Sequence, residues 1–268
     1  MKKIYLIGIG TGNPDYLTVQ AINTMRKVDV FFLLEKDGCE ELVGVRKEIL
    51  EKYMEEGSYR IVTAEICDRK KGGKSYEQGV ETWRQQKAGV IIELIKHKMK
   101  DGETGAFLIW GDPSLYDGQL EILQHILKQG TVDFEYEAIP GITSVQVLAE
   151  RHKIPLNRIG ESIVITTGRR LKEYPPAEVK NIAVVLDSYS AFKHFKDEDV
   201  NIYWGAYLGT KDEILLSGKL KDVLEDIKKL RTEAKRRKGW IMDAYILRRA
   251  EAKEIPPNPY HQCSNRKD

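Results

Sequence analysis

Apolar segments of strand length alternate with longer amphipathic segments through the first half of the chain. Strands are predicted to begin at Lys3 and to cover residues 31–34, 59–64, 106–110 and 134–138. Between strands, apolar residues recur at the helical period, as in Leu17, Ala21, Met25 and Val28. Strands that alternate with helices form a mostly parallel sheet flanked by helices. The first half is therefore predicted to be an α/β domain.

The second half has a different pattern. Short apolar runs at residues 162–166, 182–186, 202–207, 214–216 and 240–247 surround one long charged helix, residues 220–237. This mixture predicts a second α/β domain with a mixed sheet that includes antiparallel pairs. A chain of 268 residues suits two medium domains, each with its own core. We expect an N-terminal domain at 1–139, a C-terminal domain at 140–254 and a frayed tail at 255–268.

Composition excludes several functional classes. Hydrophobic residues make up 41% of the chain and charged residues 31%, with a net charge of +2, so neither disorder nor a nucleic-acid partner is indicated. No apolar run approaches the roughly 20 residues that span a bilayer, and Met1 leads directly into a strand, so we expect a cytoplasmic protein without a membrane partner. Cys39, Cys67 and Cys263 are scattered, so neither disulfides nor a metal site is predicted.

Two predicted strands end in turns that could bind a ligand. The strand at 106–110 stops at Gly111, Asp112 and Pro113, and the strand at 134–138 stops at Pro140 and Gly141, before Thr143 and Ser144 begin a helix. Open α/β sheets bind ligands at the carboxyl ends of their strands. Either turn alone is as compatible with an ordinary strand-to-helix connection as with a ligand site.

The N-terminal strand runs into a glycine-rich turn with Gly8, Gly10 and Gly12 in GxGxG spacing. A dinucleotide site would need its third glycine inside the following helix and an acidic residue about 20 positions further on. Glu35 comes close to the second requirement, but Pro14 stands where that helix should bind pyrophosphate. The turn alone is weak support for a dinucleotide-dependent oxidoreductase, which stays an alternative.

Two charged segments have simple interpretations beside functional ones. Residues 67–74 are polar with paired glycines, as in a lid over a site or, more simply, a solvated connector. The basic run at 235–238 suits RNA, but cations are also expected at the end of a helix. Residues 75–78 resemble a capping box at the start of a long helix.

Three motifs in this order resemble the tetrapyrrole (corrin/porphyrin) methylase family: GxGxGxPxxLT from Gly8, GDPxxYxG from Gly111 and PGxTS from Pro140. Residues 149–157, 165–171 and 239–249 are similar to the precorrin-6A synthase (deacetylating) branch of that family. The resemblance covers nearly the whole chain. It implies two α/β domains with a cofactor cleft between them, a homodimer, and S-adenosylmethionine as methyl donor.

The resemblance also implies roles for individual residues. The methionine end of the cofactor would contact Trp110, Gly111, Asp112 and Leu115 through backbone groups, with Thr143 and Ser144 holding its carboxylate or amine. Its adenine and ribose would lie beside Leu186, Asp187, Ala206, Tyr207 and Leu208. The family usually has an apolar residue near 187, so Asp187 is a departure that could instead bond a ribose hydroxyl. The N-terminal turn, with Pro14, would lie beside the substrate.

The reaction implied is C-methylation of precorrin-5 with loss of acetate to give precorrin-6A. Acetate loss requires water addition to a carbonyl, hence a general base. We favour Asp117 with Tyr116 beside it, and the other candidates are Asp112, Asp15 and Glu35. Because Asp112 should be engaged with the cofactor and its turn, Asp117 ranks first.

The precorrin macrocycle carries carboxylates, for which arginine is the preferred partner. Arg169 and Arg170 are the favoured substrate contacts, and the further candidates are Arg46, Arg84, Arg248 and Arg249. Besides the oxidoreductase, two alternatives are another precorrin or cobalt-precorrin methylase and a non-catalytic tetrapyrrole-binding protein.

Overall fold

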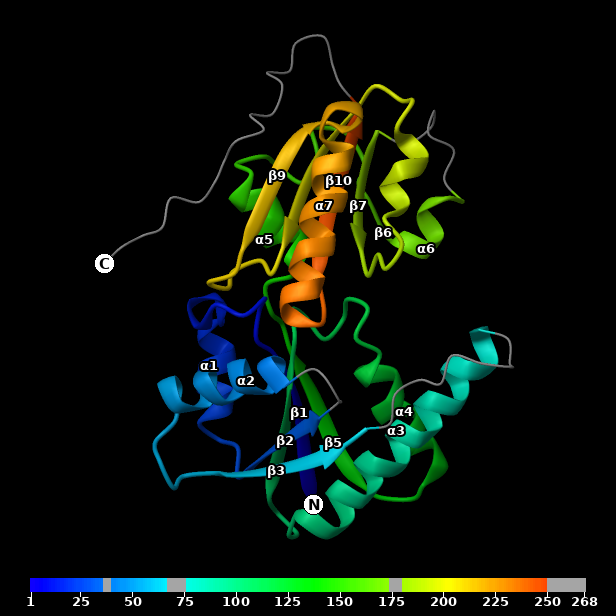
Figure 1. The fold of residues 1–268 in the computed structure, drawn as a ribbon. Coiled ribbons are helices and arrows are strands. Elements are labelled where there is room, and N and C mark those ends of the chain that lie inside the picture. Colours follow the sequence, from blue (N-terminus) through cyan, green and yellow to red (C-terminus); the bar gives the residue numbers. More distant parts are fainter. Residues whose placement is uncertain (36–39, 67–75, 174–179, 250–268) are drawn as a thin grey trace. The chain divides into compact units, whose positions relative to one another are not determined.

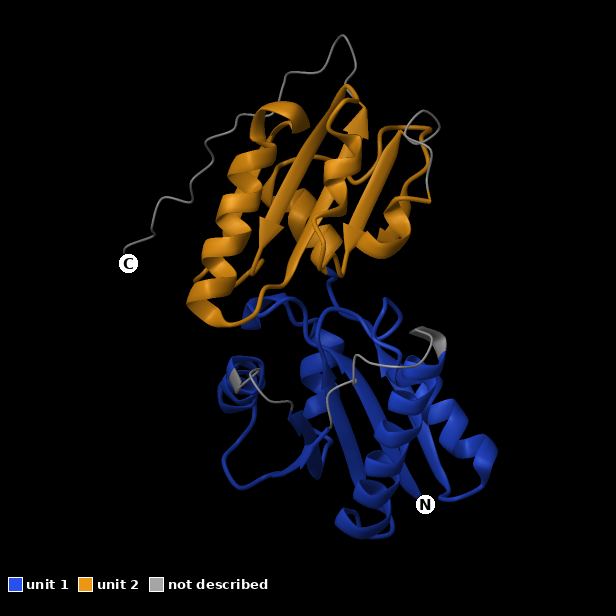
Figure 2. Ribbon diagram, turned by 45° about the vertical axis from the view of Figure 1, so that its right-hand side comes forward, with its two compact units in different colours: residues 1–143 blue, residues 144–268 orange. Residues whose placement is uncertain are grey.

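The computed structural model describes residues 1–35, 40–66, 76–173 and 180–249 (Figure 1). The chain divides into two compact units, Met1–Thr143 and Ser144–Asp268 (Figure 2). The division falls a few residues after the expected boundary at 139/140. The Gly141 N–H donates to Asp112 Oδ2 at 2.8 Å, so Gly141, just before this boundary, is bonded within the first unit.

The first unit contains a five-stranded sheet in the order β3-β2-β4-β1-β5. Every pairing in it is parallel, as the alternation of strands and helices predicted. The strands are β1 (Lys2–Gly8), β2 (Val30–Glu35), β3 (Arg60–Glu65), β4 (Thr104–Ile109) and β5 (Phe134–Ile139).

Helices cover both faces of this sheet. Helices α1 (Val19–Met25) and α2 (Glu40–Tyr53) pack on one face, where Ile7, Phe31 and Ile49 are buried together. Helices α3 (Tyr76–Lys98) and α4 (Gln119–Gln129) cover the other face, with Phe32 and Ile91 in its core. A short 3-10 helix, η1 (Pro14–Tyr16), precedes α1. We had not predicted α4, although its apolar residues recur at the helical period.

The sheet opens between β2 and β4 toward their carboxyl ends. Strand β2 pairs with β3 at six positions but with β4 only at Val30, Phe31 and Phe32. Strand β4 meanwhile stays paired with β1 as far as Ile109. Helix α2 leaves β2 on one face and α4 follows β4 on the other, so the two connections diverge at this fork.

The second unit contains a mixed five-stranded sheet in the order β6-β7-β10-β8-β9. Strands β6 (Val164–Thr167) and β7 (Asn181–Val185) are parallel. The antiparallel pairs involve β10 (Asp243–Arg249), β8 (Val200–Ala206) and β9 (Ile214–Lys219). This arrangement confirms the predicted mixed sheet.

One face of the second sheet carries the larger core. Helices α6 (Gly168–Leu171), η2 (Ala191–Phe195) and α7 (Leu220–Lys238) pack there around Trp204, Tyr245 and Phe192. Helix α5 (Ser144–Arg151) lies on the other face, where Leu148 meets Gly205 of β8. The basic run at 235–238 forms the last turn of α7, where cations complement the helix dipole.

Several predictions concern residues outside the described ranges. They include the three cysteines at 39, 67 and 263, the polar segment 67–74, the first residue of the capping box and the tail at 255–268. Within the described ranges, no helix combines the length and the apolar character that crossing a bilayer requires.

Candidate active site

Three glycines bring the carboxyl ends of β1, β4 and β5 into backbone contact. A Cβ on Gly8 would lie 2.6 Å from Gly141 N and 2.9 Å from Gly111 O, and one on Gly141 would lie 2.1 Å from Gly111 O. Only glycine fits such an approach. The two turns singled out in the sequence therefore meet, together with the end of the first strand, at one edge of the sheet.

Gly111 has one open side. Its backbone forms a bridge with Gly10, in which the Gly111 N–H donates to Gly10 O at 2.7 Å. Its φ is +70°, yet an added Cβ would meet only Thr143 Cα within 4 Å, at 3.9 Å. The amide and carbonyl are thus used by the fold, and the Cα face is what Gly111 offers to a ligand.

Asp112 fastens the two turns together. Its carboxylate accepts hydrogen bonds from Gly141 N and Ser114 N, both at 2.8 Å, and from the Ser114 hydroxyl. Burial opposes ionisation, but these hydrogen bonds outweigh it and hold the pKa of Asp112 below its usual value. The predicted engagement of Asp112 with its turn is confirmed, and its carboxylate is a poor candidate for a base.

The loop after Asp112 is conformationally strained. Tyr116 has a φ of 56°, in the left-handed region that bulky residues rarely adopt, and its side chain is 48% exposed. Strain of this kind gathers at functional sites. Asp117 is half-buried, and its Oδ1 accepts a hydrogen bond from Gln119 N at 3.0 Å at the start of α4.

The N-terminal glycine-rich turn is filled by protein atoms. A Cβ on Gly10 would lie 2.9 Å from Tyr16 Cβ, and Gly8 is packed against Gly141. The Tyr53 hydroxyl donates to Pro14 O at 3.1 Å, and Asp15 forms an exposed ion pair with Lys52. A pyrophosphate cradle needs free backbone amides at the start of a helix. The geometry of this turn therefore disfavours the oxidoreductase alternative.

In the second unit, the segment after β7 presents an apolar side chain. Leu186 has a φ of 53° and is 64% exposed, although most leucines of this unit are buried. Asp187, next to it, is buried. Its Oδ1 accepts from Tyr189 N at 2.9 Å, and its Oδ2 accepts from Ala191 N at 2.6 Å and from the Tyr245 hydroxyl at 2.7 Å.

Asp187 therefore uses its carboxylate to shape its own loop. A network of charged residues around Arg231 also stabilises this loop. Arg231 donates to Asp187 O and to the Ser190 hydroxyl and forms an ion pair with Asp243 at 2.9 Å. Burial raises the pKa of Asp243 to about 6, against the lowering effect of Arg231, and the nearby Asp187 carboxylate adds to the rise.

The residues after β8 are buried. Ala206 is the last residue of β8, and the side chains of Tyr207 and Leu208 are nearly inaccessible. Tyr207 has a φ of 50°, and its hydroxyl donates to Trp240 O at 2.6 Å. A ligand beside these residues would meet mainly backbone.

The arginine candidates fall into different environments. Arg169 and Arg170 are exposed on α6, and Arg170 pairs with Glu173. Arg248 is buried and donates to Asn181 Oδ1, Pro155 O and Leu156 O, so the fold uses it and it is not available to a substrate. Arg249 pairs with Glu198.

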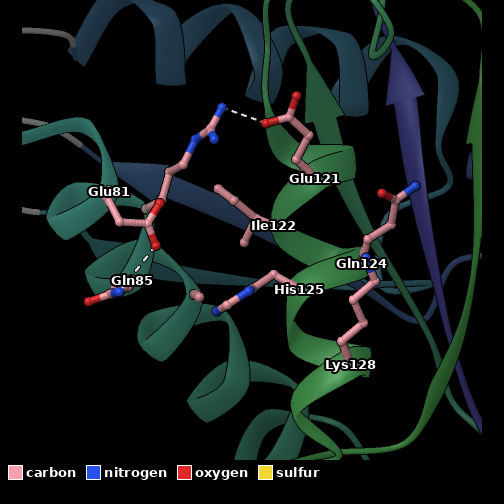
Figure 3. A pocket seen from close by; sticks show the side chains of 9 residues that line it. Glu81, Gln85, Glu121, Ile122, Gln124, His125 and Lys128 are labelled. Carbon is pink, nitrogen blue, oxygen red and sulfur yellow. Dashed lines mark hydrogen bonds and ion pairs between the residues drawn. The ribbon is translucent and has the colours of Figure 1, made fainter. Parts of the chain in front are cut away.

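Arg84 lies in a groove of about 260 Å³ between α3 and α4 (Figure 3). There it pairs with Glu121, while Gln85 donates to Glu81 at 3.1 Å. None of the residues expected to bind the cofactor lines this groove. Arg84 and Glu121 neutralise each other there, so we assign no ligand to the groove.

Sequence reasoning missed Lys87. This residue of α3 is only 8% exposed, and it lies four residues after Trp83 and four before Ile91. A lysine on the apolar stripe of a helix is a visible signal that could have identified it. The Arg231 network was missed as well, because it depends on strand neighbours that the pattern does not specify.

The model of the Tetrapyrrole (Corrin/Porphyrin) Methylases matches residues 3–224. The chain belongs to this family. A precorrin-6A synthase [deacetylating] of Sinorhizobium sp. is 44% identical over 250 residues, which cover 93% of this chain and 96% of the relative. A uroporphyrinogen-III C-methyltransferase of Cyanidium caldarium is 30% identical over 67% of this chain and 62% of that relative.

Solved structures agree with this family assignment. A cobalamin synthesis related protein (CobF) of Corynebacterium diphtheriae is 35% identical, with a TM-score of 0.80 over 94% of this chain and 100% of the other. The cobalt precorrin-4 methyltransferase CbiF shares the fold, with a TM-score of 0.59 at 21% identity over 91% of this chain and 93% of the other. This methylase is therefore an α/β methyltransferase, and the methyl donor of its family is S-adenosylmethionine.

Each unit, taken by itself, has a feature that suits that methyl donor. The open Cα face of Gly111 leaves room where any other residue would place a side chain. Leu186 supplies an exposed apolar surface of the kind that an adenine ring covers. Both features belong to loops that hydrogen bonds hold in place.

Proposed function

We propose that this methylase converts precorrin-5 to precorrin-6A, adding one methyl group to carbon and releasing acetate. The observation that carries the choice of reaction is the near-full-length similarity to the deacetylating enzyme of Sinorhizobium sp.. The turn at Gly111 supports this reaction, because its open Cα face offers a place for the methyl donor. Other precorrin and cobalt-precorrin methylases are the alternative, because they share the cofactor motifs.

The cofactor residues are proposed from two groups of loops. In the first unit they are Trp110, Gly111, Asp112, Leu115 and Thr143, followed by Ser144 at the start of α5. In the second unit they are Leu186, Asp187, Ala206, Tyr207 and Leu208. The open face of Gly111 and the exposed side chain of Leu186 support these assignments most strongly. Asp187 would contribute mainly by fixing the position of Leu186.

Bound S-adenosylmethionine supplies a methyl group that is already activated as a sulfonium. The protein's task in methyl transfer is then placement, since holding two reactants in line can lower a barrier by several kcal/mol. The hydrogen bonds of Asp112 suit this task, because they fix the turn that would align the reacting carbon. No proton transfer from Asp112 is needed.

Acetate loss requires a base. Water adds its oxygen to the acetyl carbonyl as the base removes a proton, the bond to the ring carbon breaks, and that carbon keeps the electron pair while acetate leaves. We propose Asp117 as this base. Its Oδ1 is fixed by Gln119 N, while its Oδ2 accepts no hydrogen bond from the described residues. Tyr116, strained and exposed beside it, is the second candidate.

Pro14, Arg169 and Arg170 are the proposed substrate contacts. The exposure of both arginines on α6 supports recognition of carboxylates, and the bond from Tyr53 fixes the turn at Pro14. We propose a homodimer, which the family resemblance implies, and a location in the cytoplasm. Sedimentation of the purified chain tests the dimer.

Two measurements test the proposal against its rivals. Calorimetry should detect binding of S-adenosylhomocysteine and no binding of NADH, and the reverse would favour the oxidoreductase. Mass spectrometry of the product formed from precorrin-5 should then show a gained methyl and a lost acetyl group. Turnover of a different precorrin, with precorrin-5 left unchanged, would contradict the proposed substrate.

A further inference from the structure

The fork between β2 and β4 lies at the carboxyl ends of the two strands. The strands separate after Phe32 and Phe107, and their connecting helices lie on opposite faces. In open α/β sheets, ligands bind outside the carboxyl ends of strands whose connections diverge in this way. Charged side chains that reach this fork are therefore candidates for ligand recognition.

Arg46 reaches the fork from α2. Its Nε donates to Leu108 O at 2.9 Å and its Nη1 donates to Leu42 O at 2.8 Å. Leu108 lies in the part of β4 that β2 no longer covers, so the guanidinium takes a place that a neighbouring strand would otherwise fill. These two bonds hold the group in place and leave its other N–H groups for a further acceptor.

Lys87 approaches from α3, on the opposite face. The side chains of a helix lean toward its N-terminus, and α3 begins on the side where β3 ends, so Lys87 leans toward the carboxyl edge of the sheet. Its Nζ lies 5.4 Å from the centre of the Trp83 ring. It has neither a hydrogen bond nor an ion pair with any described residue.

An ammonium that is 8% exposed and has the Trp83 ring in place of a hydrogen-bond or ion-pair partner among the described residues is costly, because burial disfavours charge. Burial accordingly lowers the pKa of Lys87, with Arg46 adding to the effect and Asp117 opposing it. Asp117 also attracts Arg46, so one carboxylate faces two cations. Together, Arg46, Lys87 and Asp117 have an excess positive charge that a bound anion would balance.

We propose that Arg46 and Lys87 form a binding site for a carboxylate group of the substrate at the β2–β4 fork. This inference rests on the proposed function, in which the substrate is a macrocycle with carboxylate side chains. A planar guanidinium and an ammonium that come from opposite faces of the sheet suit a carboxylate, because a carboxylate accepts hydrogen bonds on both oxygens. The site would fix the macrocycle beside Asp117, the proposed base.

Lys87→Met tests the site, because it keeps the length of the side chain and removes the charge. Lys96→Met is the matched control, since it removes an exposed lysine from the same helix. Affinity for precorrin-5 is measured by calorimetry in the presence of S-adenosylhomocysteine, so that no turnover occurs. Urea unfolding of each variant checks the fold.

Lys87→Met should weaken precorrin-5 binding roughly ten- to hundredfold, as expected for one lost bond to a charged group, and should leave S-adenosylhomocysteine affinity unchanged. Its stability should not fall, because the buried charge that is removed has neither a hydrogen bond nor an ion pair with any described residue and Met can still pack on the Trp83 ring. Lys96→Met should bind as the wild type does. Equal precorrin affinities for Lys87→Met and the wild type, or no binding by the wild type, would overturn the site. A wild type that binds precorrin-5 but transfers no methyl would overturn the proposed function alone.

Discussion

Gly111 combines a left-handed backbone with open space beside its Cα, a combination that distinguishes it from Gly8 and Gly141. Those two glycines are required by backbone atoms that would collide with any side chain. At Gly111 the left-handed backbone favours glycine, as it does at Gly130, and a Cβ would meet little of the protein. A side chain at Gly111 would instead project into the space proposed for the cofactor.

Gly111→Ala should therefore weaken S-adenosylhomocysteine binding at least tenfold by calorimetry. Gly130→Ala is the control, because Gly130 has a similar φ of 62° at the end of α4 and open space around it. Both variants should lose roughly 1–2 kcal/mol in urea unfolding from the left-handed conformation. Equal affinities for the two variants would place the cofactor away from Gly111.

Asp117→Asn separates the two halves of the reaction. The amide oxygen can still accept the bond from Gln119 N, so the loop should keep its shape. Methyl incorporation, which depends on placement, should continue, whereas acetate release should slow about a hundred- to ten-thousandfold. Single-turnover assays of labelled methyl and acetate follow both steps. Equal slowing of the two would remove Asp117 from the role of base.

For single residues, the sequence is informative where a contact depends on local chemistry. Pro and Gly after an apolar run located both turns, and the short side chain of Asp112 placed it in contact with its own turn. The contact between Gly8 and Gly141 could not be predicted, since it requires β1 to lie beside β5. The burial of Arg248 and the pairing of Asp187 with Tyr245 depend on β10 in the same way.

At the scale of elements, the loop between β7 and η2 is held in an unfavourable conformation by bonds from outside it. Both Leu186 and Ser190 have φ near 53°. The bonds that Asp187 accepts, and those that Arg231 donates, stabilise this conformation. Losing one bond should therefore change both stability and the position of Leu186.

Tyr245→Phe removes the hydroxyl that donates to Asp187 at 2.7 Å. We expect a loss of about 1–3 kcal/mol in urea unfolding, the usual cost of leaving a buried charged group short of a partner, and weaker S-adenosylhomocysteine binding. Tyr189→Phe, an exposed hydroxyl of the same loop, should change neither quantity. A stable Tyr245→Phe variant would show that the network does not support the loop.

Asp243 should make stability depend on pH in a definite direction. Its pKa is raised by burial from 3.8 to about 6, so between these values the folded chain holds a proton that the unfolded chain has lost. Its contribution to the free energy of unfolding is complete below pH 4 and declines as pH rises to 6. Relative to Asp243→Asn, the wild type should lose about 3 kcal/mol across this window.

Urea unfolding at several pH values between 4 and 7 measures that difference. Asp226→Asn, which removes an exposed carboxylate of α7, should show no such change relative to the wild type. A wild type that gains stability over Asp243→Asn as pH rises would mean that Arg231 outweighs burial.

Elements were predicted better than their junctions. Strand positions agree within a few residues, because apolar runs bounded by polar turns are a local signal. The residues of helix α4 were not assigned, although Ile122, Leu123 and Ile126 follow a helical pattern, because the glycines and proline of residues 111–118 indicate a turn directly before it. The fork between β2 and β4 could not be predicted, because strand order is not written in hydrophobic periodicity.

For the whole molecule, the family fixes the type of chemistry and leaves the reaction to be shown. Relatives with the same fold act on different precorrins, as the names cobalt precorrin-4 methyltransferase and precorrin-6A synthase indicate. The cofactor turns are common to such enzymes, so they do not separate one substrate from another. Release of acetate is the feature that sets the proposed reaction apart.

The most direct test is a single-turnover reaction with precorrin-5 and methyl-labelled S-adenosylmethionine, in which labelled product and free acetate are counted in the same sample. The proposed reaction predicts one acetate released for each methyl group incorporated. A labelled product that keeps its acetyl group would leave the family assignment in place and contradict the deacetylating reaction. No incorporation of label would contradict precorrin-5 as the substrate.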